Sequence, residues 1–245
     1  MHILVTRPEL DASELKVQLE AMGHTVTVEP LLQIELMPIE SDAFDGAQAV
    51  VATSRNGLRA LAESPARPAG LKLPIFAIGP ATAELARALG FARVVEGAGT
   101  AHDLVPIIAG QLEPKAGSVI HLAGETLAFD LAAALENQGI AARKIVVYRA
   151  HPPKSLTVQT TQMIVEGALD AVILMSPRTA AVFAQLVVAA GQKDSAHCLT
   201  YLCLSQAVAQ SLQSLGPVRS AVAAKPNSPE MLSLVGRVAT RPPGV

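Results

Sequence analysis

Short polar segments follow the apolar runs of this chain, and their residue types suit the binding of anions. Each begins where a β-branched run stops and an amphipathic stretch starts, and each carries Ser, Thr, Gly or Pro. Residues of these types often begin helices, and a helix start directs backbone N–H groups and a positive dipole end outward. The segments are Thr6-Arg7-Pro8, Thr53-Ser54-Arg55-Asn56, Gly79-Pro80-Ala81-Thr82, Gly99-Thr100, Gly124-Glu125, Ser176-Pro177-Arg178-Thr179, Leu204-Ser205-Gln206 and Asn227-Ser228-Pro229. Any one of them could simply be a good helix start, so it is their number that favours a polyanionic ligand.

Patterns that mark other kinds of active site do not occur in the sequence. The six histidines form neither an HExxH motif nor a pair at metal-ligand spacing, and there is no GxxxxGK[ST] or GxSxG segment. We interpret His121, inside the apolar run VIHLA, as a core residue with satisfied polar atoms, and Asp103 and Glu125 as partners of helix dipoles. An enzyme built from this chain is therefore expected to use no metal and no other cofactor, and to act by shaping and positioning its substrate.

Composition narrows the classes of partner. The 245 residues are 50% hydrophobic and 16% charged, which predicts a folded chain, and the apolar runs fall well short of the ~20 residues that span a membrane. Lys and Arg number 19 against 21 Asp and Glu, and the aromatic residues are five Phe and two Tyr without Trp. This balance supplies neither the basic excess nor the stacking surface that nucleic acid requires, so we expect no nucleic acid and no membrane as partner.

The cysteines and the amino-terminal segment bear on the cellular compartment. Cys198 and Cys203 lie in one apolar stretch, where we expect buried thiols. The opening residues MHILVTRP contain too short an apolar run for the core of a signal peptide. A reducing, cytoplasmic location is therefore the expectation.

One pattern repeats along the chain: a β-branched run, a polar turn, an amphipathic stretch and then a glycine. The glycines are Gly23, Gly90, Gly139 and Gly216, each followed by another β-branched run. A glycine in this place indicates a helix end with left-handed backbone. Apolar residues at helical spacing precede two of them, namely Leu15, Leu19 and Met22 before the first and Leu127, Leu131 and Leu135 before the third. Alternating strands and helices predict an α/β fold with parallel sheets.

An internal duplication is visible when the two halves of the sequence are aligned. A shift of 116 residues places Glu9 on Glu125 and Gly23 on Gly139, together with leucines between them. A shift of 122 places AVVATSRNGLRAL on AVILMSPRTAAVF, and a shift of 126 places AIGPATAELARALG on CLSQAVAQSLQSLG. Offsets that grow slowly are typical of loop insertions between two copies of a domain, and the period is too long for a solenoid. The sequence therefore predicts two similar parallel-sheet α/β domains.

Two ways of dividing the chain into these domains are compatible with the patterns. A contiguous division would fall near residues 114–117. In a crossed division, the extended segments 31–39 and 147–153, which contain prolines, would carry the chain out of one domain and back again. The residues alone leave both divisions open.

Taken together, the motifs resemble the uroporphyrinogen-III synthase family, whose members close the linear tetrapyrrole hydroxymethylbilane into a macrocycle and invert its last pyrrole ring. The resemblance rests on the order of the segments ILVTRP, VVATSRNGLRAL, AIGPATAELARALG, VVEGAGTAHDL, GETLAFDLAAALENQGIAARKIVVYRA and AVILMSPRTAAVF. It implies the crossed division, with residues 1–35 and 152–245 in one α/β domain and residues 38–149 in the other. It also implies a two-stranded linker near 31–39 and 147–153 and an active site in the cleft between the domains.

The resemblance further implies roles for individual residues. The tyrosine before the return crossing, a proton donor in the family, corresponds to Tyr148 in IVVYRA, and the threonine of the GPxTA turn corresponds to Thr82. The second copy departs from the pattern, with Val208 at that threonine position, and Ala123 stands where the family often has arginine. We expect the substrate to contact Arg7, Ser54, Arg55, Gly79, Thr82, Thr100, Ser176, Arg178, Ser205 and Ser228.

The family's reaction agrees with the chemistry that the residues offer. Hydroxymethylbilane is a polycarboxylate, and loss of its hydroxyl gives an azafulvenium that a pyrrole carbon attacks, so catalysis needs only modest acid assistance and control of the attacking carbon. The resemblance therefore predicts a cyclising hydro-lyase of tetrapyrrole biosynthesis without cofactors, a monomer that at most contacts the preceding enzyme of the pathway transiently. The alternative is a non-catalytic two-domain receptor that clamps an anionic small molecule, which has no use for the phenol of Tyr148.

Overall fold

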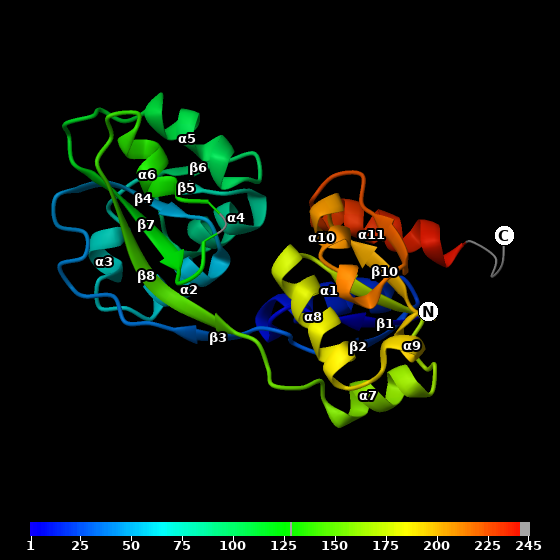
Figure 1. Ribbon diagram of the computed structural model, residues 1–245. Helices are drawn as coiled ribbons and strands as arrows, with labels where there is room; N and C mark the ends of the chain where they lie inside the picture. Colours follow the sequence, from blue (N-terminus) through cyan, green and yellow to red (C-terminus); the bar gives the residue numbers. More distant parts are fainter. Residues whose placement is uncertain (128, 241–245) are drawn as a thin grey trace. The chain divides into compact units, whose positions relative to one another are not determined.

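The computed structural model of the protein describes residues 1–127 and 129–240. The chain divides into two compact α/β units with parallel sheets (Figure 1), as the repeating pattern predicted. Unit 1 comprises Met1–Gln33 with His151–Val245, and unit 2 comprises Ile34–Ala150. The resemblance implied 1–35 with 152–245 and 38–149, of which residues 241–245 lie outside the described residues. Over the ranges described, no helix has the length and apolar character needed to cross a membrane.

Unit 1 is built on a five-stranded parallel sheet with the spatial order β11-β10-β9-β1-β2. Its central strands are buried on both faces, which is why they read as continuous apolar runs rather than as alternating ones. The strands are β1 (His2–Val5), β2 (Thr25–Val28), β9 (Ala171–Leu174), β10 (Thr200–Cys203) and β11 (Arg219–Val222).

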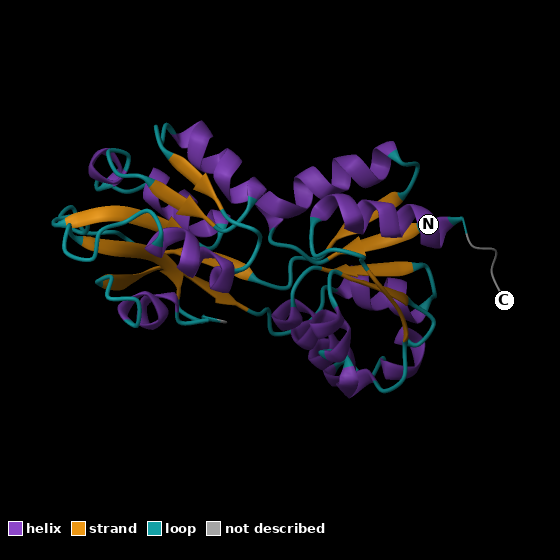
Figure 2. Cartoon of the chain, turned by 90° about the horizontal axis from the view of Figure 1, so that it is seen from above, coloured by secondary structure: helices purple, strands orange, loops and turns teal. Residues whose placement is uncertain are grey.

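Helices pack on both faces of this sheet (Figure 2), because successive side chains of a strand point to opposite sides. Leu4 and Val172 belong to the apolar core shared with α7, α8, α9 and α10, whereas Ile3 and Ile173 belong to the core shared with α1 and α11. The helices are α1 (Glu9–Ala21), α7 (Val158–Val165), α8 (Pro177–Ala189), α9 (Lys193–Ala196), α10 (Gln206–Gln210), the 3-10 turn η1 (Gln213–Leu215) and α11 (Ser228–Ala239).

Unit 2 has a six-stranded sheet with the order β3-β8-β7-β4-β5-β6. The pairs β8–β7, β7–β4, β4–β5 and β5–β6 are parallel, and β3 lies at the edge beside β8. Just after β3, the backbone N–H of Met37 donates to the carbonyl of Val147 at 2.8 Å. The strands are β3 (Gln33–Leu36), β4 (Ala47–Ala52), β5 (Ile75–Ala77), β6 (Val94–Glu96), β7 (Ser118–Gly124) and β8 (Ala142–His151).

The helices of unit 2 also cover both faces of their sheet. Val50 and Ile120 share a core with α2, α3 and α4, whereas Val51 and Val119 share a core with α5 and α6. Gly57 lets α2 approach β7 closely, since a Cβ atom there would lie 2.7 Å from the carbonyl oxygen of Leu122. The helices are α2 (Arg55–Ala62), α3 (Arg67–Gly70), α4 (Pro80–Leu89), α5 (Ala101–Ala109) and α6 (Leu131–Glu136).

The duplication seen in the sequence is also present in the two sheets. The shift of 116 residues relates β1-α1-β2 to β7-α6-β8, and the shifts of 122 and 126 relate β4 and β5 to β9 and β10. When equivalent strands are written in the same place, the order is β2-β1-β9-β10-β11 in unit 1 and β8-β7-β4-β5-β6 in unit 2. Unit 2 has β3 as an additional strand beside β8. Both are the 2-1-3-4-5 order of a doubly wound sheet. Unit 2 is therefore a circularly permuted copy, because the chain enters it at its third strand.

The predicted glycine stops have positive φ angles, with one difference of detail. Gly23, Gly90 and Gly139 follow α1, α4 and α6 with φ of 83°, 102° and 78°. Gly216 has φ of 80° but ψ of −159°, and it follows the 3-10 turn η1 rather than an α-helix. The helix before it, α10, is only five residues long, so the chain needs this additional turn before it enters β11.

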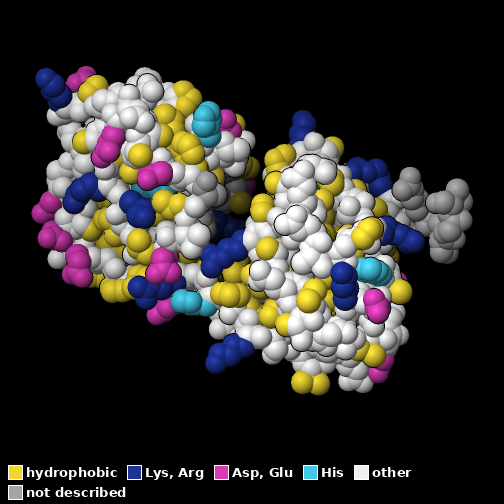
Figure 3. Space-filling model, in the orientation of Figure 1, with side chains coloured by type: hydrophobic (Ala, Val, Ile, Leu, Met, Phe, Trp, Pro, Cys, Tyr) yellow, Lys and Arg dark blue, Asp and Glu magenta, His cyan; other side chains and the backbone are white. Residues whose placement is uncertain are grey.

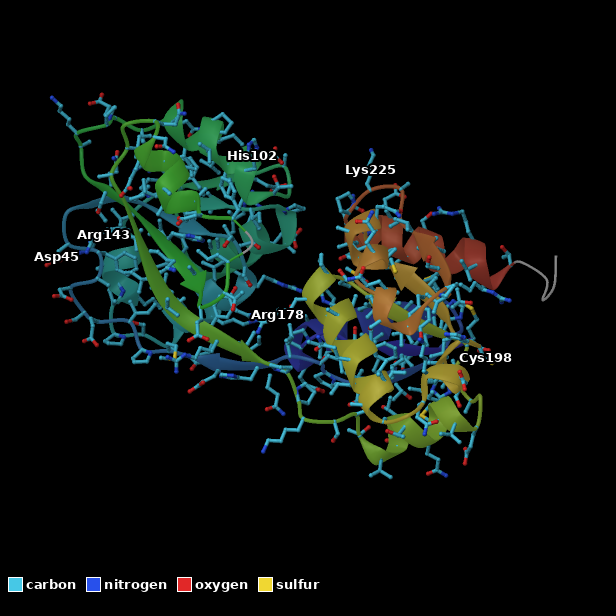
Figure 4. The ribbon with its side chains drawn as sticks, in the orientation of Figure 1. Asp45, His102, Arg143, Arg178, Cys198 and Lys225 are labelled. Carbon is cyan, nitrogen blue, oxygen red and sulfur yellow. The ribbon has the colours of Figure 1, made fainter. Side chains whose placement is uncertain are left out.

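Three interpretations that concern residues 125, 127 and 198 are wrong. The helix expected to include Leu127 begins only at Leu131, because the Asp130 side chain accepts a hydrogen bond from Ala133 N and caps α6 there. Glu125 consequently begins no helix and supports no helix dipole. Cys198 is exposed in the turn between α9 and β10 (Figure 4), whereas Cys203, in the inner strand β10, is buried as expected.

Candidate functional site

The carboxyl ends of the parallel strands form one edge in each unit, and most helices begin at that edge. In unit 2 the chain runs outward from β7 to β8 on one side and from β4 to β5 on the other, so the strand order reverses between β7 and β4. The equivalent reversal in unit 1 lies between β1 and β9. In open parallel sheets, ligands bind beyond the carboxyl ends at such a reversal. The loops at this edge of each unit are therefore the candidate site.

Tyr148 contacts a glycine at the carboxyl end of β7. The register of β7 and β8 shifts just before Gly124, which consequently pairs with Tyr148. A Cβ atom on Gly124 would lie 2.7 Å from Cζ and 2.9 Å from the hydroxyl oxygen of Tyr148, so glycine is the residue that leaves room for the phenol. The backbone N–H of Glu125 donates to the carbonyl of Tyr148 at 3.0 Å, and the Glu125 carboxylate pairs with Arg149 at 2.9 Å. The phenol thus lies against the backbone of β7 at Gly124.

Ser54 and Arg55 lie on the other side of the same reversal, where β4 leads into α2. The Ser54 hydroxyl oxygen accepts a hydrogen bond from the backbone N–H of Asn56 at 3.2 Å, and Ser54 has extended backbone. Ser54 is therefore the N-cap of α2, as the sequence predicted. Arg55 is the first residue of this helix and is partly buried. The structure thus places Tyr148, Ser54 and Arg55 at one edge of one unit.

A second polar pair at this reversal joins β7 and β4. His121 Nε2 and Thr53 Oγ1 lie 2.9 Å apart, and His121 is 1% exposed. Burial lowers the pKa of His121 to about 4, while Asp130 acts to raise it and Lys144 to lower it. His121 Nδ1 is buried without a hydrogen-bond partner among the described residues, so the expectation of a fully satisfied core histidine is wrong. Neither Thr53 nor this histidine belongs to the predicted site residues, because no motif marks a pair 68 positions apart.

The remaining predicted residues of unit 2 begin α4 and α5. Gly79 is the N-cap of α4 with Pro80 after it, and Thr82 in the first turn is 5% exposed. Thr100 is the N-cap of α5: its hydroxyl oxygen accepts from Asp103 N at 3.2 Å, and its O–H lies 2.6 Å from the Asp103 carboxylate. A substrate carboxylate at Thr100 would have to compete with this internal acceptor. Thr82 and Thr100 remain predicted contacts.

In unit 1, Arg7, Ser176 and Arg178 lie at the equivalent reversal between β1 and β9. Arg7 pairs with Asp11 in the first turn of α1 at 3.3 Å. Ser176 caps α8, since its hydroxyl oxygen accepts from the backbone N–H of Thr179 at 3.1 Å. Arg178 is exposed in the first turn of α8 (Figure 4). A capped helix of 13 residues with a cation at its start suits the binding of a carboxylate.

Ser205 and Ser228 begin the last two helices of unit 1, though not both as caps. Ser205 is the N-cap position of α10 but its side chain makes no capping hydrogen bond. Ser228 is the first residue within α11, and the cap is Asn227, whose side-chain oxygen accepts from Glu230 N at 2.9 Å. Asn227 was part of a predicted polar segment, but it was not among the predicted contact residues.

The face of each unit that Figure 3 draws carries charges of both signs. On the faces drawn in Figure 3, Lys and Arg side chains are interspersed with Asp and Glu and with apolar side chains. Among residues 1–127 and 129–240, no three His, Cys, Asp or Glu side chains gather as metal ligands would. A polyanion at such an edge would meet helix starts, hydroxyls and individual arginines.

These features define a class: a duplicated, doubly wound α/β protein whose strand reversals offer hydroxyls, helix starts and, in unit 2, a phenol beside Gly124. The family model described as uroporphyrinogen-III synthase HemD matches residues 13–233. The chain therefore belongs to the uroporphyrinogen-III synthase family. This membership supports the synthase function of the family, in porphyrin biosynthesis, over that of an anion receptor.

Solved structures agree on the fold. The crystal structure of uroporphyrinogen-III synthetase from Helicobacter pylori 26695 is 21% identical, with 97% of this chain and 99% of that chain covered and a TM-score of 0.66. A mutant uroporphyrinogen III synthase from the extremely thermophilic bacterium Thermus thermophilus is 17% identical, with 98% and 97% covered and a TM-score of 0.59. No curated protein sequence matches the chain at a significant level. At these identities the similarity concerns the fold alone.

Proposed function

We propose that this chain is a cyclising hydro-lyase that converts hydroxymethylbilane into uroporphyrinogen III. The observation that carries the proposal is the family match over residues 13–233. It is supported by the phenol of Tyr148, which lies against Gly124 at a strand reversal, the place where this type of sheet binds ligands. A receptor needs no such proton donor.

In the proposed reaction, Tyr148 is the general acid. Its O–H gives a proton to the departing hydroxyl of the substrate, so that the C–O bond breaks, water leaves and an azafulvenium remains. The substituted α-carbon of the last pyrrole then attacks this methylene, and the bond from that carbon to its original methylene breaks, which leaves a second azafulvenium. The free α-carbon of the same, now inverted, ring attacks the second methylene, and the proton that this carbon loses returns to the phenolate. The net change is loss of one water, with no oxidant or reductant. Because the hydroxyl of the substrate leaves readily, holding the two ends of the linear tetrapyrrole together contributes more to the rate than proton donation does.

The carboxylates of the substrate are proposed to bind the edge loops of both units. In unit 2 the contacts are Ser54, Arg55, Gly79, Thr82 and Thr100, and in unit 1 they are Arg7, Ser176, Arg178, Ser205 and Ser228. Capping hydroxyls and helix starts carry these contacts, since the charged residues are few. Monomeric action in the cytoplasm, with a transient contact to the enzyme that supplies the substrate, belongs to the same proposal.

The decisive experiment incubates the purified chain with freshly prepared hydroxymethylbilane, oxidises the products and separates the type I and type III isomers. We expect mainly type III product, at a rate that EDTA does not reduce. Heat-denatured chain is the control, because closure without an enzyme proceeds without ring inversion. A product that is type I in both samples would refute the proposal.

A further inference from the structure

A histidine and a threonine form a polar pair in unit 2 at a place where unit 1 is apolar. Under the shift of 116 residues His121 aligns with Val5, and the two have equivalent places in the structure, each paired with the neighbouring strand β4 or β9. Under the shift of 122 Thr53 aligns with Met175. Val5 is fully buried in its copy. The fold therefore requires a polar residue at neither position.

Packing does not explain the histidine. His121 is 1% exposed, and its Nδ1 has no partner among the described residues. A buried polar atom without a hydrogen bond destabilises the folded state, and the aligned valine shows that this position accepts an apolar side chain. The one polar contact of the ring within the described ranges is Thr53 Oγ1 at 2.9 Å, at the carboxyl end of β4. The contact with Thr53 is therefore the feature that can explain the presence of His121.

The unpartnered nitrogen indicates where the proton of the neutral ring lies. If Nδ1 carried the proton, a buried N–H donor would have no acceptor, whereas a proton on Nε2 leaves only an unpaired acceptor at Nδ1. Orphaned buried N–H groups are the rarer of the two in folded proteins. This preference assigns the proton to Nε2, and with that assignment the ring N–H donates to the Thr53 oxygen across the 2.9 Å contact. The hydroxyl hydrogen of Thr53 then has no acceptor among residues 1–127 and 129–240, and it is available to a ligand.

We infer that His121 is a positioning residue, which holds the Thr53 hydroxyl so that its hydrogen is donated to a substrate carboxylate at the reversal between β7 and β4. The inference rests on the proposed function and adds two residues to its substrate contacts. Thr53 is partly exposed and directly precedes Ser54, which is itself a proposed substrate contact. A hydroxyl that accepts a hydrogen bond is also polarised as a donor.

The test compares KM and kcat for hydroxymethylbilane in the full chain and in five variants. Thr53→Val removes the hydroxyl with little change of shape, His121→Val introduces the residue of the other copy, and a third variant combines the two. His121→Gln is the rescue variant, because its side-chain amide keeps an N–H donor near the position of Nε2. The control is Thr27→Val in unit 1, where Thr27 Oγ1 lies 2.9 Å from His2 Nε2 in a pair of the same type on β2 and β1.

We expect Thr53→Val and His121→Val each to raise KM about three- to tenfold, which is the size of effect of one lost hydrogen bond, while kcat changes less than about twofold. The KM of the double variant should be no higher than that of the single variant with the higher KM, because both substitutions remove the same contact. His121→Gln should keep KM close to that of the wild type, and Thr27→Val should leave it unchanged. Circular dichroism of each variant confirms that it is folded.

Several results would overturn the inference. An unchanged KM in Thr53→Val would mean that the hydroxyl meets no substrate, and an unchanged KM in His121→Val would mean that Thr53 needs no positioning. Multiplication of the two effects in the double variant would show independent roles. If the wild type forms no type III product, the proposed function fails separately. The affinities of the same variants for uroporphyrin III, a polycarboxylate, then decide the inference by the same pattern.

Discussion

The phenol of Tyr148 is the group at the candidate site whose removal tests acid assistance directly. We expect Tyr148→Phe to lower kcat by roughly 10- to 100-fold, at or below the lower end of the range for general acid catalysis, because the hydroxyl of the substrate leaves readily without help. The fraction of type III product should persist. Single-turnover kinetics with isomer analysis measures both quantities. Unchanged turnover would reduce Tyr148 to a packing residue, and a change to type I product would show that the phenol also directs ring inversion.

The chain supplies a matched control for this substitution. Tyr201 is the other tyrosine, fully buried in β10, and its hydroxyl donates to the carbonyl of Ala196 at 3.0 Å. Burial raises its pKa well above the usual range. Tyr201→Phe should therefore leave turnover unchanged and lower the free energy of unfolding by about 1 kcal/mol, the typical contribution of one hydrogen bond.

Gly124 positions the phenol without carrying any chemistry. In Gly124→Ala the new Cβ atom would lie 2.7 Å from Tyr148 Cζ, so the ring must move. We expect a loss of kcat similar to that of Tyr148→Phe and no further loss when the two are combined. Gly236→Ala is the control, because the atom nearest to its Cβ is Met22 Cε at 3.9 Å. Full activity in Gly124→Ala would show that the position of the ring is not critical.

Site residues were predictable from sequence where a local motif marks them, and not where strands meet. Ser54 and Ser176 follow apolar runs and cap helices, so their local pattern is sufficient. The contact of Gly124 with Tyr148 depends on a register shift between β7 and β8, and the His121–Thr53 pair depends on the neighbourhood of β7 and β4. Strand register is a property of the folded sheet, and no spacing in the sequence encodes it.

At the scale of elements, a buried carboxylate fixes the start of α7 to the end of β2. Glu29 is 3% exposed, and its two oxygens accept from Thr157 N at 3.0 Å and from the hydroxyls of Thr157 and Thr160, each at 2.5 Å. Thr157 is the N-cap of the helix. The carboxylate therefore satisfies donors at a helix start and lies near its positive dipole end.

We expect Glu29→Ala to lower the free energy of unfolding of unit 1 by about 2–3 kcal/mol, because hydrogen bonds to a charged group are lost and their donors remain buried. Relative to the wild type, amide hydrogen exchange in Glu29→Ala should become faster in α7 and change less in α11. Thr161→Val is the control. The Thr161 hydroxyl is exposed, and among the described residues it donates only to the carbonyl of Thr157. Equal stability of Glu29→Ala and the wild type would contradict a role for this carboxylate in holding α7.

Element types were more predictable than element limits. Alternating apolar runs and glycine stops identified the strand–helix pattern, since Gly23, Gly90 and Gly139 need positive φ where their helices end. The length of α6 was overestimated because apolar spacing continued back to Leu127, whereas capping by Asp130 decides where the helix begins. Helix starts depend on one hydrogen bond, which a periodicity averaged over several turns does not resolve.

Stability of the whole molecule should depend on pH through His121. Its pKa is about 4 in the folded protein and about 6.5 in the unfolded chain, so below pH 6.5 the unfolded chain takes up a proton that the folded protein does not. The folded state therefore loses stability as the pH falls from 6.5 towards 4, on the order of 2 kcal/mol between pH 8 and pH 5. His121→Val should lack this loss.

Urea unfolding of the wild type and His121→Val at about pH 8 and pH 5, followed by circular dichroism, measures the effect. The other titrating groups are shared by both proteins, so they cancel in the difference between them. We subtract the free energy of unfolding of the wild type from that of the variant. This difference should be about 2 kcal/mol larger at pH 5 than at pH 8, which means that the variant gains stability relative to the wild type as the pH falls. The same relative stability at both pH values would mean that the ring is protonated in the folded protein.

The permuted arrangement of the two copies has a consequence for synthesis on the ribosome. Residues 34–150 form unit 2 from one continuous segment, so it can fold as soon as that segment has emerged. Unit 1 begins earlier and finishes later, because β1 and β2 must wait for β9, which lies between β1 and β10 in its sheet. During that interval the apolar side chains of β1, among them Ile3 and Val5, have no completed core to enter. The apolar side chains of β1 therefore stay without their complete core while unit 2, which lies between the two segments of unit 1, is already able to fold.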